Sequence, residues 1–347
     1  MLCYYGLSRP ADRACRMTPS ASAGPPPSLW VVAACFNEAA GIEAFIGAIE
    51  ALGLVEQLLL IDDGSRDGTA AVVRRDIEAR RQQPQAMPVN LIELTRNFGK
   101  EAAMLAGLDQ ARGRCDAVVL IDADLQHPPE LIPEMVSHWQ NGAEMVTAIR
   151  SPEDQESRLK IISASGFYSL FNRLTDSVQL VDGAGDFRLL SQPVVRALTD
   201  MREGTRFSKA LFPWTGFESV DISYDRPPRS SGASTWNVRR LFSYALDGIF
   251  SFSVLPLRIW IAVGTVISLI SLVYALILVI STLLHGIDVP GYASLIVAVL
   301  FLGGVQLIGI GILGEYIGRI FEESKRRPPY LVRRISASAS SDRQGEA

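Results

Sequence analysis

Three residues with side-chain oxygens, Asp122, Asp124 and Gln126, alternate directly after the apolar run Ala117–Ile121. Alternate side chains of an extended segment point the same way, so these oxygens are expected on one side. Two carboxylates with few other protein ligands suit Mg²⁺ or Mn²⁺ whose coordination is completed by substrate phosphates. We therefore predict a divalent-metal site made by Asp122, Asp124 and Gln126. The alternative is a solvated turn that caps the following helix.

A second acidic run, Asp62-Asp63-Gly64-Ser65-Arg66-Asp67, follows another apolar segment. Carboxylates at the end of a strand can accept hydrogen bonds from a nucleobase imide or a ribose hydroxyl, and Asp67 can cap the next helix. A capped turn without a ligand remains the alternative. The chain has no GxGxxG at a strand-to-helix turn and no P-loop, which argues against the standard dinucleotide and triphosphate folds.

The elements that position these acids are short apolar runs, which alternate along the chain with segments of helical periodicity. The strands are expected at Leu29–Cys35, Leu58–Ile61, Val89–Leu94, Ala117–Ile121 and Glu144–Ile149. The helices are expected at Ala39–Leu52, Asp67–Arg81, Lys100–Arg112 and Pro129–Gln140. This order predicts an α/β fold with a mainly parallel sheet, in which ligands bind at the carboxyl ends of the strands. Between about residues 151 and 255 we expect an antiparallel edge, loops and amphipathic helices, with residues 238–257 lying in a membrane interface.

Two apolar segments, at about 259–284 and 293–317, are each long enough to span a bilayer. Basic residues flank their outer ends, and the turn around Asp288 has none. The positive-inside rule therefore predicts a two-helix hairpin with the catalytic domain and both termini in the cytoplasm. The pair Gly314 and Gly318 matches a small-xxx-small pattern, which leaves packing within the hairpin and oligomerisation both open.

The composition agrees with a globular domain joined to apolar membrane segments. Hydrophobic residues make up 48% of the 347, charged residues 20%, and the net charge is −4, so we expect no nucleic-acid partner. The four cysteines form no CxxC pair and are expected to be reduced. Residues 1–28, which include Pro25-Pro26-Pro27, are expected to be a disordered leader, and Met17 is a second candidate start.

Five motifs in register resemble glycosyltransferase family 2: Phe36-Asn37-Glu38, Asp62–Thr69, Arg96–Lys100, Asp122–Glu130 and Gly185–Arg188. The similarity is to the branch with polyprenyl-phosphate acceptors, which includes bactoprenol glucosyltransferases and dolichyl-phosphate mannose synthases. It covers about residues 29–327. It implies a GT-A-type (Rossmann-like) catalytic domain at 29–237, transmembrane helices within 258–318 and a basic cytoplasmic tail at 319–347.

The resemblance also implies roles for individual residues. Asp186 is expected beside the sugar and acceptor, with Asp124 as the second catalytic residue. Binding of the nucleotide-sugar is expected from Phe36, Glu38, Asp62, Asp63, Lys100 and Asp122. The acceptor phosphate needs cations near the membrane, and guanidinium groups suit bidentate contact with phosphate. The candidates for that contact are Arg150, Arg158, Ser163, Arg206, Arg226 and Arg229.

The expected activity is inverting transfer of a hexose from a nucleotide-sugar, with UDP-glucose preferred, to undecaprenyl or another polyprenyl phosphate at the inner membrane. GDP-mannose, UDP-N-acetylglucosamine and a modified arabinose donor remain open. A processive polysaccharide synthase would carry more spans and a Gln-x-x-Arg-Trp motif, which the sequence lacks. A non-catalytic membrane scaffold would not need the three acids Asp122, Asp124 and Asp186.

Overall fold

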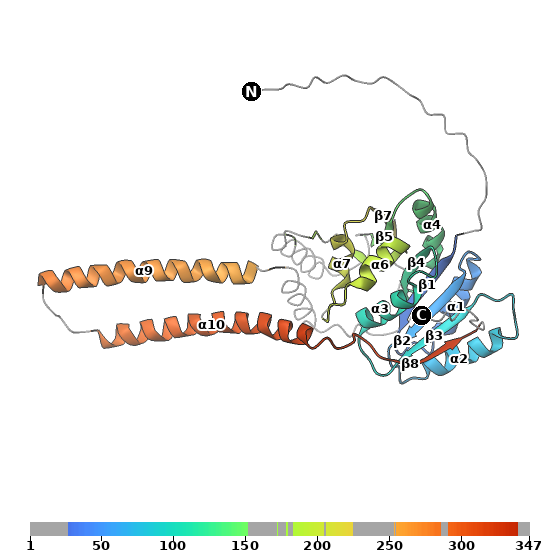
Figure 1. The fold of residues 1–347 in the computed structure, drawn as a ribbon, viewed down its shortest axis with the longest axis horizontal. Helices are drawn as coiled ribbons and strands as arrows, with labels where there is room; N and C mark the ends of the chain where they lie inside the picture. The colour runs from blue at the N-terminus through green and yellow to red at the C-terminus, as the bar shows by residue number, and fades with distance from the viewer. Residues whose placement is uncertain are drawn as a thin grey trace, which may run out of the picture.

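The structure is a computed structural model that describes residues 27–151, 172, 178–179, 183–204, 206–224, 253, 255–285 and 291–338. Nearly all of the expected leader and of the expected interfacial helix at 238–257 lies outside these residues. The helices and strands that position the cleft fall within the described ranges, as do both long apolar helices (Figure 1).

An eight-stranded sheet forms the centre of the catalytic domain, with the order β7-β5-β6-β4-β1-β2-β3-β8. The strands are β1 Leu29–Cys35, β2 Gln57–Asp62, β3 Val89–Leu94, β4 Ala117–Asp122, β5 Met145–Arg150, β6 Ala184–Ser191, β7 Ser219–Tyr224 and β8 Val332–Ala337. The neighbours β4, β1, β2 and β3 run parallel, whereas β6 and β8 run antiparallel to the strands beside them. The first five expected strands are confirmed to within a residue or two at their ends.

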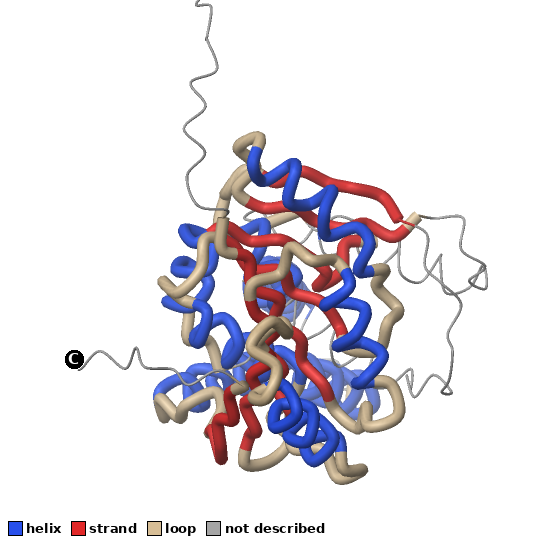
Figure 2. The backbone as a smooth tube through the Cα atoms, turned by 90° about the vertical axis from the view of Figure 1, so that its right-hand side faces the viewer, coloured by secondary structure: helices blue, strands red, loops and turns tan. Residues whose placement is uncertain are grey.

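Helices cover both faces of this sheet (Figure 2). They are α1 Ile42–Ala51, α2 Thr69–Arg80, α3 Lys100–Ala111, α4 Ile132–Gln140, α6 Gln192–Asp200 and α7 Ser208–Trp214, with a short 3₁₀ turn, η1 Pro129–Leu131, before α4. Alternation along β1 explains the two layers, because Val31 and Ala33 pack with α1, α2 and α4, whereas Trp30 and Val32 pack with α3, α6 and α7. The parallel strands are buried on both faces, as continuous apolar runs predict.

The antiparallel strand within residues 151–255 is β6. It lies inside the sheet and not at its edge, which corrects the expectation for this segment. β6 pairs with both β4 and β5. Its segment from Phe187 to Ser191 is buried, so this strand needs neighbours on both sides. One edge is instead β7, which runs parallel to β5, and the other is β8 from the C-terminal tail.

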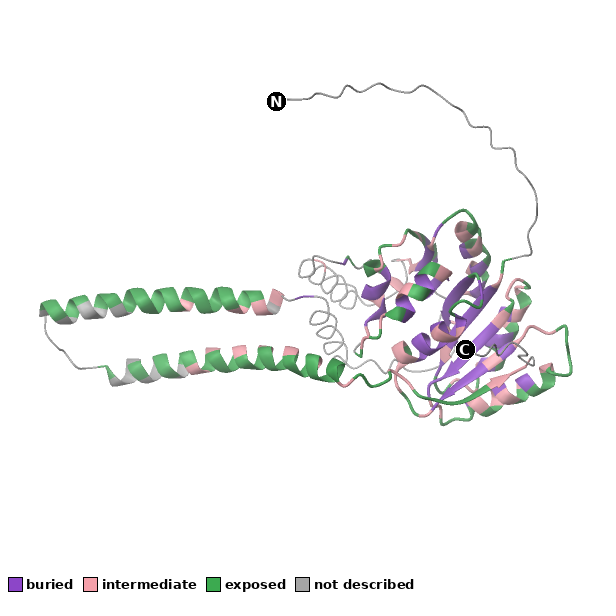
Figure 3. Ribbon diagram, in the orientation of Figure 1, coloured by how far each residue is buried: buried purple, intermediate pink, exposed green. Residues whose placement is uncertain are grey.

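Two long helices, α9 Leu255–His285 and α10 Tyr292–Ser324, extend from the domain and lie side by side (Figure 1). Their apolar side chains are exposed along most of their length (Figure 3). The Tyr316 hydroxyl donates to the carbonyl of Ser253 at 2.7 Å, which ties the start of α9 to the last turns of α10. Gly309 lies against Trp260, where a Cβ would clash, whereas a Cβ at Gly314 or Gly318 would meet no atom of the described residues within 4 Å.

After α10 the chain returns to the catalytic domain. β8 pairs antiparallel with β3, and the Tyr330 hydroxyl donates to Asp109 of α3 at 2.5 Å. The Gly204 N–H donates to the Glu323 carboxylate of α10 at 2.6 Å. The residues after the second apolar helix are therefore part of the catalytic sheet, a placement that the sequence pattern did not indicate.

Candidate active site

A cleft opens at the carboxyl ends of β1, β2 and β4, as expected for a parallel sheet. Six of the eight residues that the sequence assigned to the nucleotide-sugar or metal line it: Phe36, Glu38, Asp63, Lys100, Asp122 and Asp124. The remaining lining residues are Ala34, Cys35, Asn97, Gly99 and Ala123. Phe36 is 44% exposed, which leaves an aromatic face accessible to a ligand.

Asp63 fixes the loop that carries Lys100 into the cleft. Its two carboxylate oxygens accept the backbone N–H groups of Phe98 at 2.7 Å and Gly99 at 2.9 Å. Burial raises the pKa of the Asp63 carboxyl, although these two donors act in the opposite direction. Asp62 does not line the cleft. Its carboxylate accepts the backbone N–H of Ser65 at 3.3 Å and so shapes the turn after β2.

The turn after β1 is fixed by the turn after β2. Asn37 has a left-handed backbone (φ 58°), and its side-chain oxygen accepts the Arg66 N–H at 2.9 Å. The Glu38 N–H donates to the Thr69 hydroxyl at 2.9 Å. Burial, followed by the negative charges of Asp124 and other nearby acids, raises the pKa of the Glu38 carboxyl. Glu38 is thus held toward the acids that follow β4.

Lys100 is the cation at the centre of the cleft. Its Nζ lies 2.7 Å from an oxygen of Asp122 and 2.6 Å from an oxygen of Asp186. Burial opposes the charge on Lys100, but Asp186 and Asp122 outweigh it and raise the pKa of the ammonium. The same pairing holds the pKa of the buried Asp186 carboxyl below its ordinary value, against the effect of burial. Asp186, at the start of β6, is therefore joined to the end of β4 through one lysine.

The residues after β4 fit a divalent cation. Gln126 does not line the cleft, but it is 7% exposed and its side-chain oxygen accepts no hydrogen bond, so it is a buried acceptor that a cation could satisfy. Asp122 and Asp124 add carboxylates, so the donor set is all oxygen. In the described part of the chain, no three His, Cys, Asp or Glu side chains could hold a metal by themselves. A cation here would depend on Gln126, water or substrate phosphates for its other ligands.

His127 supports this turn from behind. Its ring stacks on Phe187 at 5.2 Å between centroids, and burial lowers its pKa, which favours the neutral imidazole. Its Nδ1 lies 3.5 Å from the backbone nitrogen of Asp122, so the ring orients the turn without supplying charge.

Comparison with known proteins identifies the family. The protein-family model described as Glycosyl transferase family 2 matches residues 30–199, and the family model described as GtrB C-terminal hairpin matches residues 255–320. A bactoprenol glucosyl transferase of Shigella phage SfV is 42% identical over 307 residues, which cover 87% of this chain and 97% of the relative. The chain belongs to glycosyltransferase family 2.

Two further relatives support this assignment. A prophage bactoprenol glucosyl transferase homolog of Escherichia coli K12 is 40% identical and covers 88% of this chain and 98% of the relative. An uncharacterized glycosyltransferase of Synechocystis is 44% identical and covers 88% and 94%. The expected fold and enzyme class are confirmed: the sheet is a GT-A-type domain, the two apolar helices form the C-terminal hairpin, and the protein is a glycosyltransferase.

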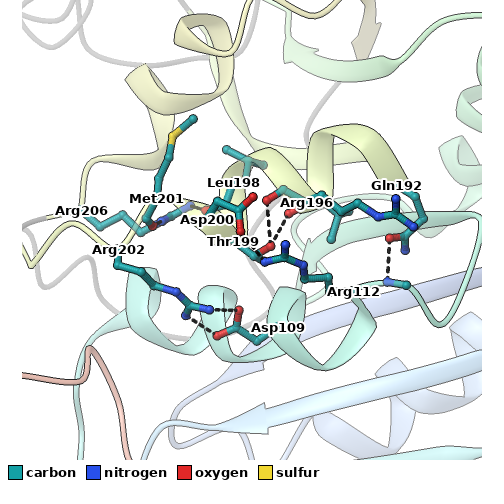
Figure 4. Close-up of polar contacts among 12 residues, drawn as sticks. Asp109, Arg112, Gln192, Arg196, Leu198, Thr199, Asp200, Met201, Arg202 and Arg206 are labelled. Atoms are coloured by element: carbon teal, nitrogen blue, oxygen red, sulfur yellow. Dashed lines mark hydrogen bonds and ion pairs between the residues drawn. The ribbon is translucent and has the colours of Figure 1, made fainter. Parts of the chain in front are cut away.

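The expected phosphate-binding residues of this glycosyltransferase are placed only in part. Arg150 ends β5. Arg206 donates to the carbonyls of Met201 at 2.8 Å and Leu198 at 3.1 Å, so it fixes the loop after α6 (Figure 4). Arg158, Ser163, Arg226 and Arg229 lie outside the described residues. The acceptor site therefore remains a proposal.

Sequence reasoning did not single out the contact between α3 and α7. The Ser208 hydroxyl and backbone N–H both donate to the carboxylate of Glu101, the residue after Lys100. Burial, followed by the nearby Asp186, raises the pKa of Glu101 to about 7. Arg188 lies over the Phe212 ring at 4.4 Å and donates to Thr147 at 2.8 Å. No local spacing could reveal these contacts, because Ser208 and Glu101 are 107 residues apart and Arg188 and Thr147 are 41 apart.

Proposed function

We propose that this glycosyltransferase transfers a hexose, with inversion, from a nucleotide-diphosphate sugar to undecaprenyl or another polyprenyl phosphate, and that UDP-glucose is the preferred donor. One observation carries the proposal: an acid-lined cleft and two exposed apolar helices belong to one chain that matches bactoprenol glucosyl transferases over nearly their whole length. A lipid acceptor explains why the catalytic domain is joined to a membrane hairpin.

The nucleobase, the nucleoside and the diphosphate of the donor each have partners among the residues of the site. The exposed ring of Phe36 can stack on the nucleobase, and Glu38 and Asp63 present carboxylates to the nucleoside. Asp122, Asp124 and Gln126 would hold Mg²⁺ or Mn²⁺ near the diphosphate. When bound, this cation supplies Lewis-acid neutralisation of the charge that develops on the leaving group.

The acceptor needs little help to become a nucleophile. A phosphate monoester is mostly ionised near neutral pH, because its second pKa is roughly 6. One of its oxygens attacks the anomeric carbon, the bond from that carbon to the diphosphate breaks, and the electron pair leaves with the nucleoside diphosphate. Asp186, already ionised beside Lys100, orients the sugar and stabilises positive charge at the anomeric carbon instead of removing a proton.

The test is a panel of radiolabelled nucleotide-sugars incubated with membranes that contain the protein. We expect label from UDP-glucose in the lipid extract and less from GDP-mannose, UDP-N-acetylglucosamine or a modified arabinose donor. Membranes with Asp186→Asn are the matched control, because this change keeps the shape of the side chain and removes its charge. Label in the lipid from another donor would change the sugar but not the enzyme class. Label in no lipid from any donor would overturn the proposal.

A further inference from the structure

The charge of the cleft poses a problem for the proposed acceptor. Four acids line it, namely Glu38, Asp63, Asp122 and Asp124, and Lys100 is the single cation among the lining residues. Lys100 already bonds to Asp122 and Asp186. A phosphate carrying close to two negative charges must approach Asp186 to reach the sugar. It therefore needs a further cation at that point.

Two of the described arginines in this region, Arg188 and Arg206, are engaged by the protein. Arg188 is 4% exposed and donates to the Gly185 carbonyl at 3.0 Å and to Thr147. Arg206 donates to two backbone carbonyls and, at 3.3 Å, to the Ser208 hydroxyl. Moving either guanidinium to a phosphate would leave these acceptors without their donors, which is costly for buried groups.

The first turn of α7 contacts the elements that carry Lys100 and Asp186. Ser208, its first residue, is bonded to Glu101, the neighbour of Lys100. Phe212, one turn later, lies under Arg188 of β6. This turn is therefore fixed between the start of α3, which carries Lys100, and the start of β6, which carries Asp186.

Lys209 is in that turn. Its positive charge acts on Asp186 and helps to lower the pKa of that carboxyl. Within the described residues, no carboxylate lies within ion-pair distance of Lys209. One oxygen of Asp186 bonds to Lys100, and the other is buried without a donor. Lys209 is thus a half-buried lysine in the turn that lies between the elements of Lys100 and Asp186, and no acid of the described residues pairs with it.

We propose that Lys209 binds the phosphate of the polyprenyl acceptor and holds it beside Asp186. This inference rests on the proposed function and adds a residue that the motifs of the family resemblance do not contain. The ammonium offsets the repulsion between the acceptor phosphate and Asp186, so that the phosphate oxygen can approach the anomeric carbon. Lys209 binds and positions the acceptor and transfers no proton.

The test is steady-state kinetics of the full chain in detergent, with donor and lipid both varied. For Lys209→Met we expect the KM for polyprenyl phosphate to rise by about tenfold or more, since a hydrogen bond to a charged group contributes roughly 1.5–3 kcal/mol. The KM for the nucleotide-sugar should stay within about twofold, because the donor has other partners. Lys209→Arg should restore part of the lipid affinity. Lys325→Met is the matched control, because Lys325 is a surface lysine bonded to Glu322.

Slow hydrolysis of the nucleotide-sugar in the absence of lipid reports whether Lys209→Met still folds, and Lys209→Gln replaces it if that activity is lost. Equal rises in both KM values, or an unchanged lipid KM, would overturn the proposal. If the wild type labels no lipid, the proposed function fails. The role of Lys209 is then tested by measuring the binding of farnesyl phosphate to the wild type and to Lys209→Met, with farnesol as the control ligand. Binding that Lys209→Met abolishes would still support the inference. Binding that it leaves unchanged, or no binding by the wild type, would overturn it.

Discussion

At the scale of single residues, the cleft is organised by opposite charges that come from distant parts of the chain. Lys100 joins Asp122 and Asp186, although 64 residues separate the two acids in sequence. The Lys100 side chain lines the cleft and is 41% exposed, while its ammonium bonds to both acids. The acids and this lysine together form the reaction centre that we propose.

We predict that activity depends on a divalent cation held in part by Asp124. Asp124→Asn should lower kcat/KM by about 10²–10³-fold, because charge stabilisation in the transition state is lost. EDTA should abolish wild-type activity, and Mg²⁺ or Mn²⁺ should restore it. The matched control is Asp76→Asn on α2, where Asp76 bonds to Arg80. Activity that survives both the chelator and the substitution would show that the metal assignment is wrong.

A second residue-level prediction concerns Glu101, whose pKa rises from 4.5 to about 7 in the folded protein. Between these values the folded state binds the proton more tightly than the unfolded state. The free energy of unfolding therefore falls as the pH rises through this window. Glu101→Gln does not titrate and keeps an oxygen for Ser208. The Tm of the wild type should fall relative to this variant between about pH 5 and pH 8.

The measurement is thermal unfolding in detergent across that pH range, with Glu43→Gln on the exposed face of α1 as the control. A difference in Tm between Glu101→Gln and the wild type that stays constant with pH would contradict the prediction. A wild-type Tm that rises relative to that of Glu101→Gln at high pH would also contradict it, because the ionised carboxylate would then stabilise the fold.

At the scale of elements, the loop before α3 depends on a close approach to the turn after β2. Gly64 has a left-handed backbone (φ 72°), and a Cβ there would lie 2.6 Å from the carbonyl carbon of Arg96 and 2.7 Å from the nitrogen of Asn97. Backbone atoms cannot rotate away as a flexible side chain can. The turn and the loop must therefore separate if a side chain is added, and this separation would shift Lys100.

We therefore predict that Gly64→Ala lowers both the Tm and the affinity for the nucleotide-sugar. The matched control is Gly68→Ala, because Gly68 also has a left-handed backbone (φ 97°), but its added Cβ would meet no atom of the described residues within 4 Å. Both variants carry the cost of the backbone conformation, roughly 1–2 kcal/mol. Only Gly64→Ala adds the clash, roughly 1–3 kcal/mol. Equal effects of the two changes on donor affinity would contradict the proposed contact.

At the scale of the whole molecule, the hairpin begins and ends at the catalytic domain. Tyr316 near the end of α10 bonds to Ser253 before α9, and β8 then joins the catalytic sheet. The apolar side chains of α9 and α10 are exposed along both helices. An exposed apolar surface of this extent favours association with a membrane. We therefore expect both outer ends of the hairpin on the side of the membrane that holds the catalytic domain.

We predict a multi-pass inner-membrane protein whose catalytic domain and C-terminus are cytoplasmic. A tag inserted at Asp288, in the turn between the helices, should be labelled from the non-cytoplasmic side of intact cells. A tag after Ala347 is the control and should be labelled only after the cells are permeabilised. A protected tag at Asp288 together with an exposed C-terminus would reverse the orientation.

The sequence by itself determined the elements and their chemistry, because both depend on local patterns. Short apolar runs and helical spacing predicted the strands and helices that carry the cleft, and the run at Asp122–Gln126 identified a candidate cation site. Two long apolar segments predicted the hairpin. Motif order then identified the family, which the comparisons confirm. The acids after β1, β2 and β4 converge because parallel strands end at one edge of the sheet.

Only the tertiary structure decided which distant residues meet. β6 lies in the interior of the sheet, because its buried backbone N–H and C=O groups need a strand on each side. β8 joined β3 after two membrane helices, a pairing that no local signal in the tail encodes. The same holds for Lys100 with Asp186 and for Ser208 with Glu101. These contacts depend on packing between elements far apart in sequence, which hydrophobic periodicity does not specify.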